Sequence, residues 1–390
     1  MRINYTDVQW YCSVDGRFYP GTLSVTDGVI TALTPKGEVP PAAERTESLK
    51  GRLVIPGLVD VHTHGCMGSD FSSADGAGMR AMARAYAARG VTALMPTLAS
   101  APLSRMKTAV ELIAGLREAG TGGARFLGVH LEGRYLNPAK RGAHAAELLT
   151  PLDPDELEAL LFRTCPPPAH VTAAYELDPT GQFLARVLSL GGTAGLAHTC
   201  ADYDETMAAI EGGLTSVSHL FNTMHPLHHR EPGPVCAALT TDVYTEVICD
   251  GRHVHPGMVR LAHAAKKRGR FVLVTDSMEA TGMGDGEYRI AGMPVTVKDG
   301  EARTHDGALA GSLLHLMDGV HNLVRFAGIT FGEAVLCATR APADMVGCST
   351  VGDLLPGRMA DFLVLDTDDP CALTPGIAGV YLGGLPLHEA

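Results

Sequence analysis

The segment LVIPGLVDVHTHG (53–65) decides the fold class of this 390-residue chain. It is a short apolar run that ends in Asp60 and continues into His62-Thr63-His64. Seven further β-rich apolar runs follow, separated by Ala-rich or amphipathic stretches. Short strands that alternate with helices are typical of parallel α/β architectures, and eight of them predict a (β/α)8 barrel. A doubly wound open sheet is the alternative, but nothing in the chain resembles its Gly-rich dinucleotide loop.

The eight runs are Leu53–Val61, Val91–Met95, Phe126–Leu131, Val171–Tyr175, Thr193–Ala197, Leu214–Ser218, Tyr244–Cys249 and Phe271–Thr275. The clearest helical stretches between them are Met79–Arg89, Leu103–Ala119, Asp155–Arg163, Gln182–Leu190, Tyr203–Glu211 and Pro256–Arg268. A Gly-rich stretch, Thr281 to Ser312, follows the eighth run. We expect Tyr288–Ile290 and Val295–Lys298 within it to form a hairpin over the barrel mouth. Further helices are predicted at Leu314–Phe326 and Phe331–Cys337.

The two ends of the chain predict a separate β-domain. Strand-like segments lie at Ile3–Trp10, Gly21–Val25, Val29–Leu33 and Ala360–Leu365. The first three are separated by Asp15-Gly16 and Asp27-Gly28, dipeptides that favour hairpin turns. We therefore predict a small β-sandwich domain built from residues 1–52 and 350–390, beside a (β/α)8 barrel formed by residues 53–349.

Composition excludes several classes of partner. The chain has 31 Lys and Arg against 43 Asp and Glu, a net charge of −12, so it has no general attraction to nucleic acid or anionic membranes. No run approaches the roughly 20 apolar residues of a membrane span, and the N-terminus lacks an apolar signal-peptide core. The nine Cys form no C-x-x-C pair, which argues against a disulfide framework or a thiolate zinc site. We expect a cytoplasmic protein without nucleic-acid or membrane partners.

Catalytic groups in such a barrel lie at the C-terminal ends of the strands. The residues found there are Asp60, His62, His64, His130, Glu132, Glu176, His198, His219, Asp250, His253 and Asp276. One His-x-His pair among 17 His is close to chance, but residues i and i+2 of a strand face the same way, so His62 and His64 could both point into the mouth. Imidazoles and carboxylates are ligands for zinc or iron. Four His and two carboxylates could hold two ions, and because no Lys closes a barrel strand, Glu132 is the candidate bridge.

Asp276 and Arg230 have the residue types needed for acid–base work and for anion binding. Asp276 closes an apolar run, where a carboxylate is costly to bury unless it is paired or bound to metal. Near a metal it could take a proton from water and deliver it to a leaving nitrogen; a helix N-cap is the alternative. Arg230, in the loop after the sixth run, could bind an anion together with His253; a solvated loop is the alternative.

These motifs resemble the amidohydrolase superfamily and, within it, the N-acetylglucosamine-6-phosphate deacetylases. The resemblance covers nearly the whole chain. It rests on VIPGLVDVHTHG (54–65), HLEGRYLNPAKRGAH (130–144), AHTCA (197–201), SHLFNTMHPLHHREPG (218–233), CDGRHVHP (249–256), LVTDSMEATG (273–282), LAGS (309–312) and PGRMADFLVLD (356–366). The His-x-His pair and terminal Asp mark only the superfamily, whereas HLEG, HLFN-x-M and DG-x-H together are specific to the deacetylases.

The resemblance implies hydrolysis of N-acetyl-D-glucosamine 6-phosphate to D-glucosamine 6-phosphate and acetate, a reaction of amino-sugar catabolism. The implied mechanism is attack by metal-bound hydroxide, with Asp276 as acid and base. One or two divalent ions per subunit are implied, with zinc as the first expectation and iron, manganese or cobalt as alternatives. The implied site residues are Glu132, His198 and His219 as principal metal ligands, His62 and His64 as second-metal ligands with Asp276 at the same centre, His144 polarising the acetamide carbonyl, Ala143, Asn222, Thr223, Leu309, Ala310 and Gly311 contacting substrate, and Arg230 and His253 contacting phosphate.

Two features leave the substrate and assembly open. The family's counterpart of Arg230 reaches in from a neighbouring subunit, so the resemblance implies a homodimer. Arg134 stands where the family usually has Pro, and we expect it at the pocket rim or in solvent. The alternatives are a related amidohydrolase acting on N-acetylgalactosamine 6-phosphate or another N-acyl substrate, and a non-catalytic scaffold, which would have lost metal ligands that this chain retains.

Overall fold

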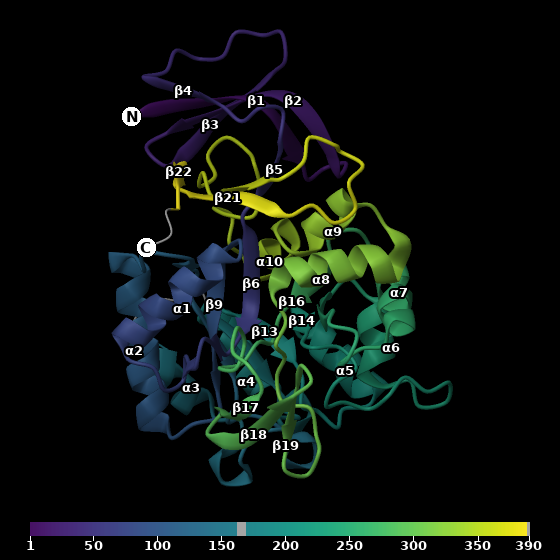
Figure 1. Cartoon of the computed structure of the whole chain (residues 1–390). Coiled ribbons are helices and arrows are strands. Elements are labelled where there is room, and N and C mark those ends of the chain that lie inside the picture. Colours follow the sequence, from purple (N-terminus) through teal and green to yellow (C-terminus); the bar gives the residue numbers. More distant parts are fainter. Residues whose placement is uncertain (162–168, 388–390) are drawn as a thin grey trace.

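The computed structural model describes residues 1–161 and 169–387, and in them eight parallel strands form the predicted barrel (Figure 1). The strands are β6 (Leu58–Thr63), β9 (Val91–Ala99), β11 (Val129–Glu132), β12 (Ala169–Ala173), β13 (Thr193–Leu196), β14 (Ser216–Val217), β15 (Tyr244–Ile248) and β16 (Phe271–Val274). Each pairs in parallel with the next along the chain. The short strand β10 (Arg125–Phe126) extends the sheet beside β9.

Backbone hydrogen bonds close the barrel between its first and last strands. The N–H of Asp276 donates to the carbonyl of His62, and the N–H of His64 donates to the carbonyl of Ser277, each at 2.8 Å. These bonds hold the C-terminal ends of β6 and β16 side by side. Both members of the His-x-His pair and the terminal Asp therefore meet at one point of the rim.

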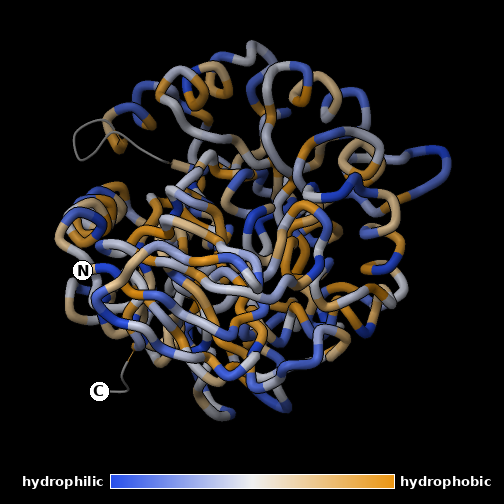
Figure 2. The backbone as a smooth tube through the Cα atoms, turned by 90° about the horizontal axis from the view of Figure 1, so that it is seen from above, coloured by the Kyte–Doolittle hydropathy of each residue, from blue (hydrophilic) through white to orange (hydrophobic). Residues whose placement is uncertain are grey.

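Helices surround the barrel, and their outward faces are hydrophilic (Figure 2). They are α1 (Gly76–Ala88), α2 (Leu103–Ala119), α3 (Pro154–Leu161), α4 (Gln182–Ser189), α5 (Tyr203–Glu211), α6 (Gly233–Thr240), α7 (Pro256–Ala265), α8 (Leu316–Leu323), α9 (Phe331–Cys337) and α10 (Arg340–Met345), with short turns η1 (Pro138–Lys140), η2 (Ala146–Leu148), η3 (Tyr175–Leu177) and the π-helical η4 (Val324–Gly328). The start of α5 is fixed by a capping box, in which Asp202 and Glu205 each accept the other's backbone N–H. Among the described residues, no helix has the length and apolar character needed to cross a membrane.

The sequence pattern missed two helices. Helix α6 has the sequence GPVCAALT and is buried on most of its surface, so it shows no amphipathic period. Helix α10, RAPADM, is only six residues long and contains a proline. Residues 162 and 163 of the predicted third helix lie outside the described residues.

Strands from both ends of the chain form the predicted sandwich-like domain, whose eight-stranded sheet is called the terminal sheet below. It contains β1 (Arg2–Cys12), β2 (Arg17–Thr26), β3 (Val29–Pro35), β4 (Arg45–Ser48), β5 (Leu53–Pro56), β20 (Phe362–Leu365), β21 (Ile377–Leu382) and β22 (Leu385–Pro386). Strand β5 lies between β1 and β20 and so joins the two ends. The ring of Phe362 stacks on Tyr381 at 4.5 Å and meets the edge of Tyr5 at 5.3 Å, which packs the same junction.

The predicted first barrel run, Leu53–Val61, is wrong as a single strand because it divides at Gly57. Its first half, β5, belongs to the terminal sheet, and its second half opens the barrel. A Cβ on Gly57 would lie 1.9 Å from Oγ1 of Thr92, so only glycine fits where the chain crosses between the two sheets. We keep the proposed division into two domains and move its first boundary to this glycine.

A three-stranded antiparallel sheet, called the mouth sheet below, lies at the end of the barrel opposite the terminal sheet (Figure 1). It contains β17 (Gly286–Ile290), β18 (Met293–Lys298) and β19 (Glu301–Thr304). The predicted hairpin is confirmed, and β19 adds a third strand that the pattern did not indicate. A second small hairpin, β7 (Gly65–Cys66) and β8 (Ser69–Asp70), follows the His-x-His pair.

An ion pair ties the barrel to the terminal sheet. Nε and Nη2 of Arg125 donate to the buried carboxylate of Asp361 at 2.6 and 3.1 Å. Arg125→Ala would leave that carboxylate without a cation, and we expect the free energy of unfolding to fall by about 1–3 kcal/mol. Urea unfolding followed by the fluorescence of Trp10, the single Trp of the chain, measures this. Arg45→Ala, which breaks an exposed pair with Glu47, is the control, and equal losses in the two variants would contradict the prediction.

Candidate metal centre and active site

Glu132, at the end of β11, lies between two pairs of imidazoles. Its Oε2 is 3.1 Å from Nε2 of His62 and 3.0 Å from Nε2 of His64. Its Oε1 is 2.9 Å from Nε2 of His219 and 3.5 Å from Nε2 of His198. One carboxylate therefore offers one oxygen to each pair, which is the geometry required of a bridging ligand.

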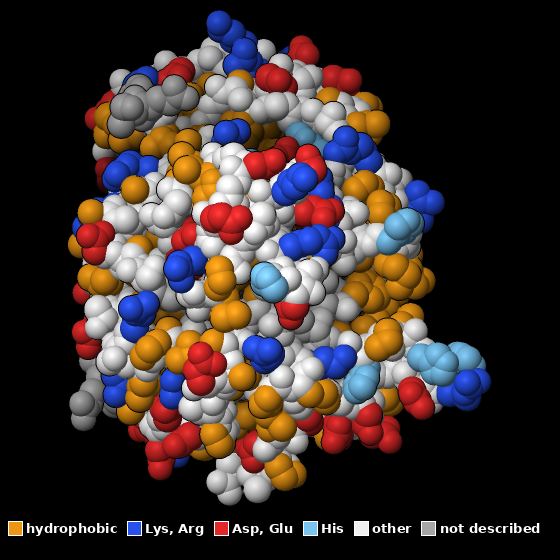
Figure 3. All heavy atoms as spheres, turned by 60° about the horizontal axis from the view of Figure 1, so that its bottom comes forward, with side chains coloured by type: hydrophobic (Ala, Val, Ile, Leu, Met, Phe, Trp, Pro, Cys, Tyr) orange, Lys and Arg blue, Asp and Glu red, His pale blue; other side chains and the backbone are white. Residues whose placement is uncertain are grey.

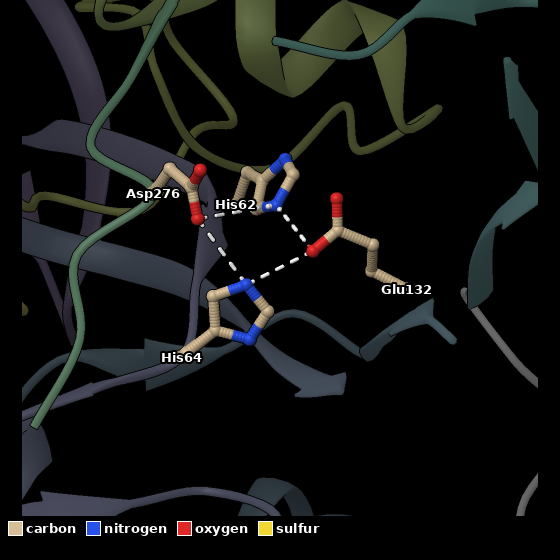
Figure 4. Close-up of side chains that lie close together, drawn as sticks. All are labelled: His62, His64, Glu132 and Asp276. Atoms are coloured by element: carbon tan, nitrogen blue, oxygen red, sulfur yellow. Dashed lines mark ion pairs between the residues drawn. The ribbon is translucent and has the colours of Figure 1, made fainter. Parts of the chain in front are cut away.

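Asp276 completes the first group, as Figure 4 shows. Its Oδ1 lies 3.2 Å from Nε2 of His64 and 3.7 Å from Nε2 of His62. The backbone turns sharply where the strands end, because His198, His219 and Asp276 have φ angles of 47°, 28° and 48°. Left-handed φ at a non-glycine residue costs about 1–3 kcal/mol and is concentrated at functional sites. At each of these three residues the turn brings the side chain to the group of donors around Glu132.

The carboxylates of this centre are held ionised. Burial alone would raise the pKa of Glu132, but His62, His198 and His219 hold that pKa well below its usual range. Asp276 behaves in the same way: burial opposes ionisation, while His62 and His64 lower its pKa. Two ionised carboxylates thus lie where the imidazole nitrogens converge, a set of donors that can bind a cation.

The donors fit a divalent metal ion. Two groups of ligand atoms lie within 4.8 Å of one another: His62, His64, Glu132 and Asp276, and Glu132, His198 and His219. In the described part of the chain, the buried Nε2 of His62 has no hydrogen-bond partner. Nδ1 of His198 contacts the carbonyl of Lys140 at 2.8 Å, which leaves its Nε2 for a ligand role. Imidazole nitrogen with carboxylate oxygen suits zinc, iron, manganese or cobalt.

All of these donors except His62 line a cavity of about 440 Å³. The predicted site residues that line it are His64, Glu132, Ala143, His144, His198, His219, Asn222, Thr223, His253, Asp276, Leu309, Ala310 and Gly311. The mouth sheet contributes Ile290 and Arg303 to the same cavity. Apart from His62 and Arg230, the candidate metal donors and the residues predicted to contact substrate therefore share one pocket, and their individual roles remain predictions.

His144 presents a hydrogen-bond donor to this cavity. The hydroxyl of Ser100 accepts the N–H of Arg134 at 3.0 Å and lies 2.9 Å from Nδ1 of His144. The backbone N–H of Ser100 also points at Nδ1, at 3.4 Å. Nδ1 is therefore an acceptor, and the proton of the neutral ring is on Nε2. Burial lowers the pKa of His144 to about 3, so the ring is neutral at physiological pH.

The two predicted phosphate contacts have different positions. His253 lines the cavity, and its Nδ1 is fixed by Asp250 at 2.7 Å. Arg230 is exposed in the loop 225–231, which projects from the barrel between α5 and α6 (Figure 1). In the described residues Arg230 lines a separate hollow with Asp202 and His228. Figure 3 shows His side chains beside Lys or Arg on a projection at the right edge of this face. The chain's own fold does not bring Arg230 to its own cavity.

The expectation for Arg134 is wrong. Its side chain is buried rather than at the pocket rim or in solvent, and it forms a two-point ion pair with Glu156 of α3 at 2.9 and 3.0 Å. The φ angle of Arg134 is 67°, a conformation that proline cannot adopt. The side chain of Arg134 therefore anchors α3 to the end of β11 and does not line the pocket.

Sequence reasoning missed two residues that contact the site. Ser100 orients His144 from the end of β9, and Glu246 of β15 accepts a hydrogen bond from Nδ1 of His62 at 2.8 Å. Glu176, noted at the end of the fourth run, binds Thr199 and the backbone of Cys200 and so supports the loop after β13. Polar residues alternate along β12 (His170 and Thr172), but Thr245 and Glu246 are adjacent in β15, so no local pattern indicated Glu246.

The fold and the site define a (β/α)8 barrel with a candidate centre for one or two metal ions. The family model described as "Amidohydrolase family" matches residues 53–384. The chain belongs to the amidohydrolase family, which confirms that prediction.

Particular relatives share most of the chain. It is 36% identical over 347 residues to N-acetylgalactosamine-6-phosphate deacetylase of Escherichia coli O157:H7, covering 88% of this chain and 90% of the relative. It is 35% identical to N-acetylglucosamine-6-phosphate deacetylase of Vibrio furnissii (81% and 79% covered) and 34% identical to that of Homo sapiens (83% and 82%). Solved structures of N-acetylglucosamine-6-phosphate deacetylases have the same fold as this chain.

Two of those structures cover nearly the full length. A mutant of the Mycobacterium smegmatis deacetylase in complex with N-acetyl-D-glucosamine-6-phosphate matches with a TM-score of 0.87 at 30% identity, over 100% of this chain and 99% of that one. The Thermotoga maritima deacetylase matches with a TM-score of 0.86 at 29% identity, over 99% and 100%. These matches confirm the barrel with a β-domain from both termini.

The bridging position of Glu132 makes metal content a direct test. Glu132→Gln removes a charged ligand from both groups, and we expect the metal retained after dialysis to fall about tenfold or more. Elemental analysis of the purified protein measures it. Glu147→Gln, which changes an exposed carboxylate in η2, is the control. Wild-type metal content in Glu132→Gln would rule out Glu132 as a ligand.

Proposed function

We propose that the chain hydrolyses the acetamide of N-acetyl-D-glucosamine 6-phosphate, releasing D-glucosamine 6-phosphate and acetate in amino-sugar catabolism. The observation that carries this proposal is one cavity lined by Asp276, His144, His253 and every candidate metal donor except His62. The names of the relatives, which match over most of the chain, support the same reaction. A cytoplasmic location remains a prediction from the sequence.

We infer that zinc is the first candidate for the ion, with iron, manganese or cobalt as alternatives. Glu132, His198 and His219 would hold one ion, and His62, His64 and Asp276 would hold a second with the shared Glu132. A divalent ion bound by such donors lowers the pKa of a bound water and polarises a carbonyl oxygen.

Asp276 is the proposed acid and base. Its side chain lines the cavity and is held ionised, so it can accept a proton from the attacking water. The water oxygen bonds to the acetyl carbon, the carbon–nitrogen bond breaks, and Asp276 returns the proton to the leaving amine nitrogen. The carboxylate is ionised again at the end of the cycle.

His144 is the proposed donor to the acetamide oxygen. Because Nδ1 accepts a hydrogen bond from Ser100, the ring carries its proton on Nε2 and can donate from there. A neutral donor fixed before substrate arrives stabilises the charge that develops on this oxygen, an effect worth about 10²–10³ in kcat for one donor.

The proposed phosphate contacts are His253 of the same subunit and Arg230 of the partner subunit. His253 is on the cavity wall, while Arg230 lies on the projecting loop and is free to reach another molecule. Binding energy at the phosphate would orient the acetamide at the reacting end. This assignment requires the proposed homodimer.

The rates of acetate release from different N-acetyl sugars test which of them is the substrate. We expect N-acetylglucosamine 6-phosphate to be hydrolysed fastest, with unphosphorylated N-acetylglucosamine slower by at least about 10²-fold because the phosphate contacts are lost. The second candidate is N-acetylgalactosamine 6-phosphate, which the 36% identity to the Escherichia coli relative favours. Faster hydrolysis of that epimer would replace the proposed substrate, and no release from a metal-loaded sample would reject both.

Complementation tests the roles of Asp276 and Arg230 together. Asp276→Asn should lower kcat by about 10²–10⁴ while the Glu132, His198 and His219 group keeps its metal. Arg230→Ala should lower kcat/KM in every site that it serves. If Arg230 acts across a twofold dimer, coexpressing the two variants makes mixed dimers with one intact site, restoring up to about a quarter of wild-type activity. Activity no higher than that of the better single variant would place Arg230 outside the neighbouring site.

A further inference from the structure

Glu246 is a buried carboxylate beneath the candidate metal centre that the proposed mechanism does not use. It lies on β15 inside the barrel and has no exposed surface. Its Oε2 is 2.8 Å from Nδ1 of His62. Its Oε1 accepts hydrogen bonds from the hydroxyls of Ser218 at 3.1 Å and Ser216 at 3.4 Å, and lies 3.5 Å from Nε2 of His170.

The position is costly for a carboxylate. Removing an ionised group from water costs several kcal/mol unless a positive charge and hydrogen bonds offset it. Ser216 and Ser218 are neutral donors and cannot balance the charge, and of the two imidazoles that face Glu246, His62 is nearer at 2.8 Å than His170 at 3.5 Å. His62 connects Glu246 to the group of metal donors, so a cation bound at Nε2 of His62 would balance the charge through the imidazole ring.

The same contact selects one tautomer of His62. With its proton on Nδ1, the ring donates to Glu246 and leaves the lone pair of Nε2 available to a cation that would be shared with Glu132, 3.1 Å away, and Asp276, 3.7 Å away. The other tautomer would direct a nitrogen lone pair at the carboxylate of Glu246. His64 differs, because its buried Nδ1 has no hydrogen-bond partner in the described residues.

We propose that Glu246 is a positioning residue that fixes His62 in its metal-binding tautomer and favours occupancy of the His62 and His64 group by a divalent ion. The inference rests on the proposed occupancy of that group. It also implies that the two candidate groups differ in what supports them, since Nδ1 of His198 is held by a neutral backbone carbonyl.

Cobalt titration of metal-stripped protein tests the inference. Glu246→Gln keeps the shape and an acceptor but removes the charge, and Glu246→Leu removes the acceptor. We expect the affinity for the second ion to fall about tenfold in the first variant and about 100-fold in the second. The first ion should bind within about threefold of wild type. Visible absorption of bound cobalt and elemental analysis after gel filtration measure affinity and stoichiometry.

Thr172→Val is the matched control. Thr172 lies in the same polar interior and contacts His130 and Ser218; it reaches Glu246 only through Ser218, and the described residues show no hydrogen bond from it to His62. It should lower thermal stability without changing cobalt binding. A merely structural role for Glu246 predicts the same behaviour for Glu246→Gln, and that outcome would overturn the inference. If Glu246→Leu does not fold, Glu246→Gln decides alone.

The test separates this inference from the proposed function. Two ions in wild type with unchanged affinities in Glu246→Gln would reject the role of Glu246, whereas acetate release by the same samples would leave the deacetylase proposal intact. A wild-type chain that binds one ion, with an affinity unaffected by His62→Asn, would also overturn the inference. Loss of the second ion in the Glu246 variants, with the first retained, supports it.

Discussion

The balance of charge around Glu132 is the constraint on which the barrel mouth depends. A carboxylate with 2% of its surface exposed must be offset on every side. Here one oxygen faces two imidazoles from the end of β6, and the other faces imidazoles that follow β13 and β14. The strands must therefore end at one level around the rim. The closing bonds between β6 and β16 and the left-handed turns after β13 and β16 meet that requirement. The local strain of those turns is tolerated because the surrounding packing leaves no alternative conformation.

Beneath the mouth, the barrel interior is polar rather than the apolar packing typical of such folds. His130 contacts Thr97 at 3.2 Å and Thr172 at 2.8 Å, while His170 contacts Thr193 at 2.9 Å. Such networks are costly when incomplete and rigid when complete. The interior thus supports the donors from below with directional bonds, which fix ring orientation in a way that apolar packing would not.

Much of the fold and site was predictable because barrel geometry converts a position along the chain into a position in space. A residue that closes an apolar run lies at the mouth, so Glu132, His198, His219 and Asp276 could be placed together from the sequence. Gly57 could not be interpreted in this way, because the apolar runs on its two sides join different sheets.

Other features depend on contacts that no local pattern encodes. Arg134 immediately follows a candidate ligand segment, yet its backbone conformation sends it to Glu156, a partner supplied by a helix about 20 residues later. Glu246 lies within an apolar run, and its contact with His62 depends on the register of β15, which the sequence does not show. Ser100 acts through a turn whose geometry the sequence does not specify. The place of a residue at the end of a strand predicted which side chains meet, and contacts between distant parts of the chain determine how those side chains are oriented.

The arrangement of β5 has a consequence for synthesis. This strand pairs with β1 on one side and β20 on the other, so one edge is open until Phe362 and the residues after it are made. At about 5–20 residues per second, a ribosome needs about 15–60 s to cover that interval. Throughout it, a fully apolar strand, LVIP, presents unpaired backbone groups of the kind that recruit other chains. The nascent protein is therefore exposed to misassembly at the terminal sheet, at the end of the barrel opposite the candidate active site. The sheet is complete only when the last strands of the chain have been made.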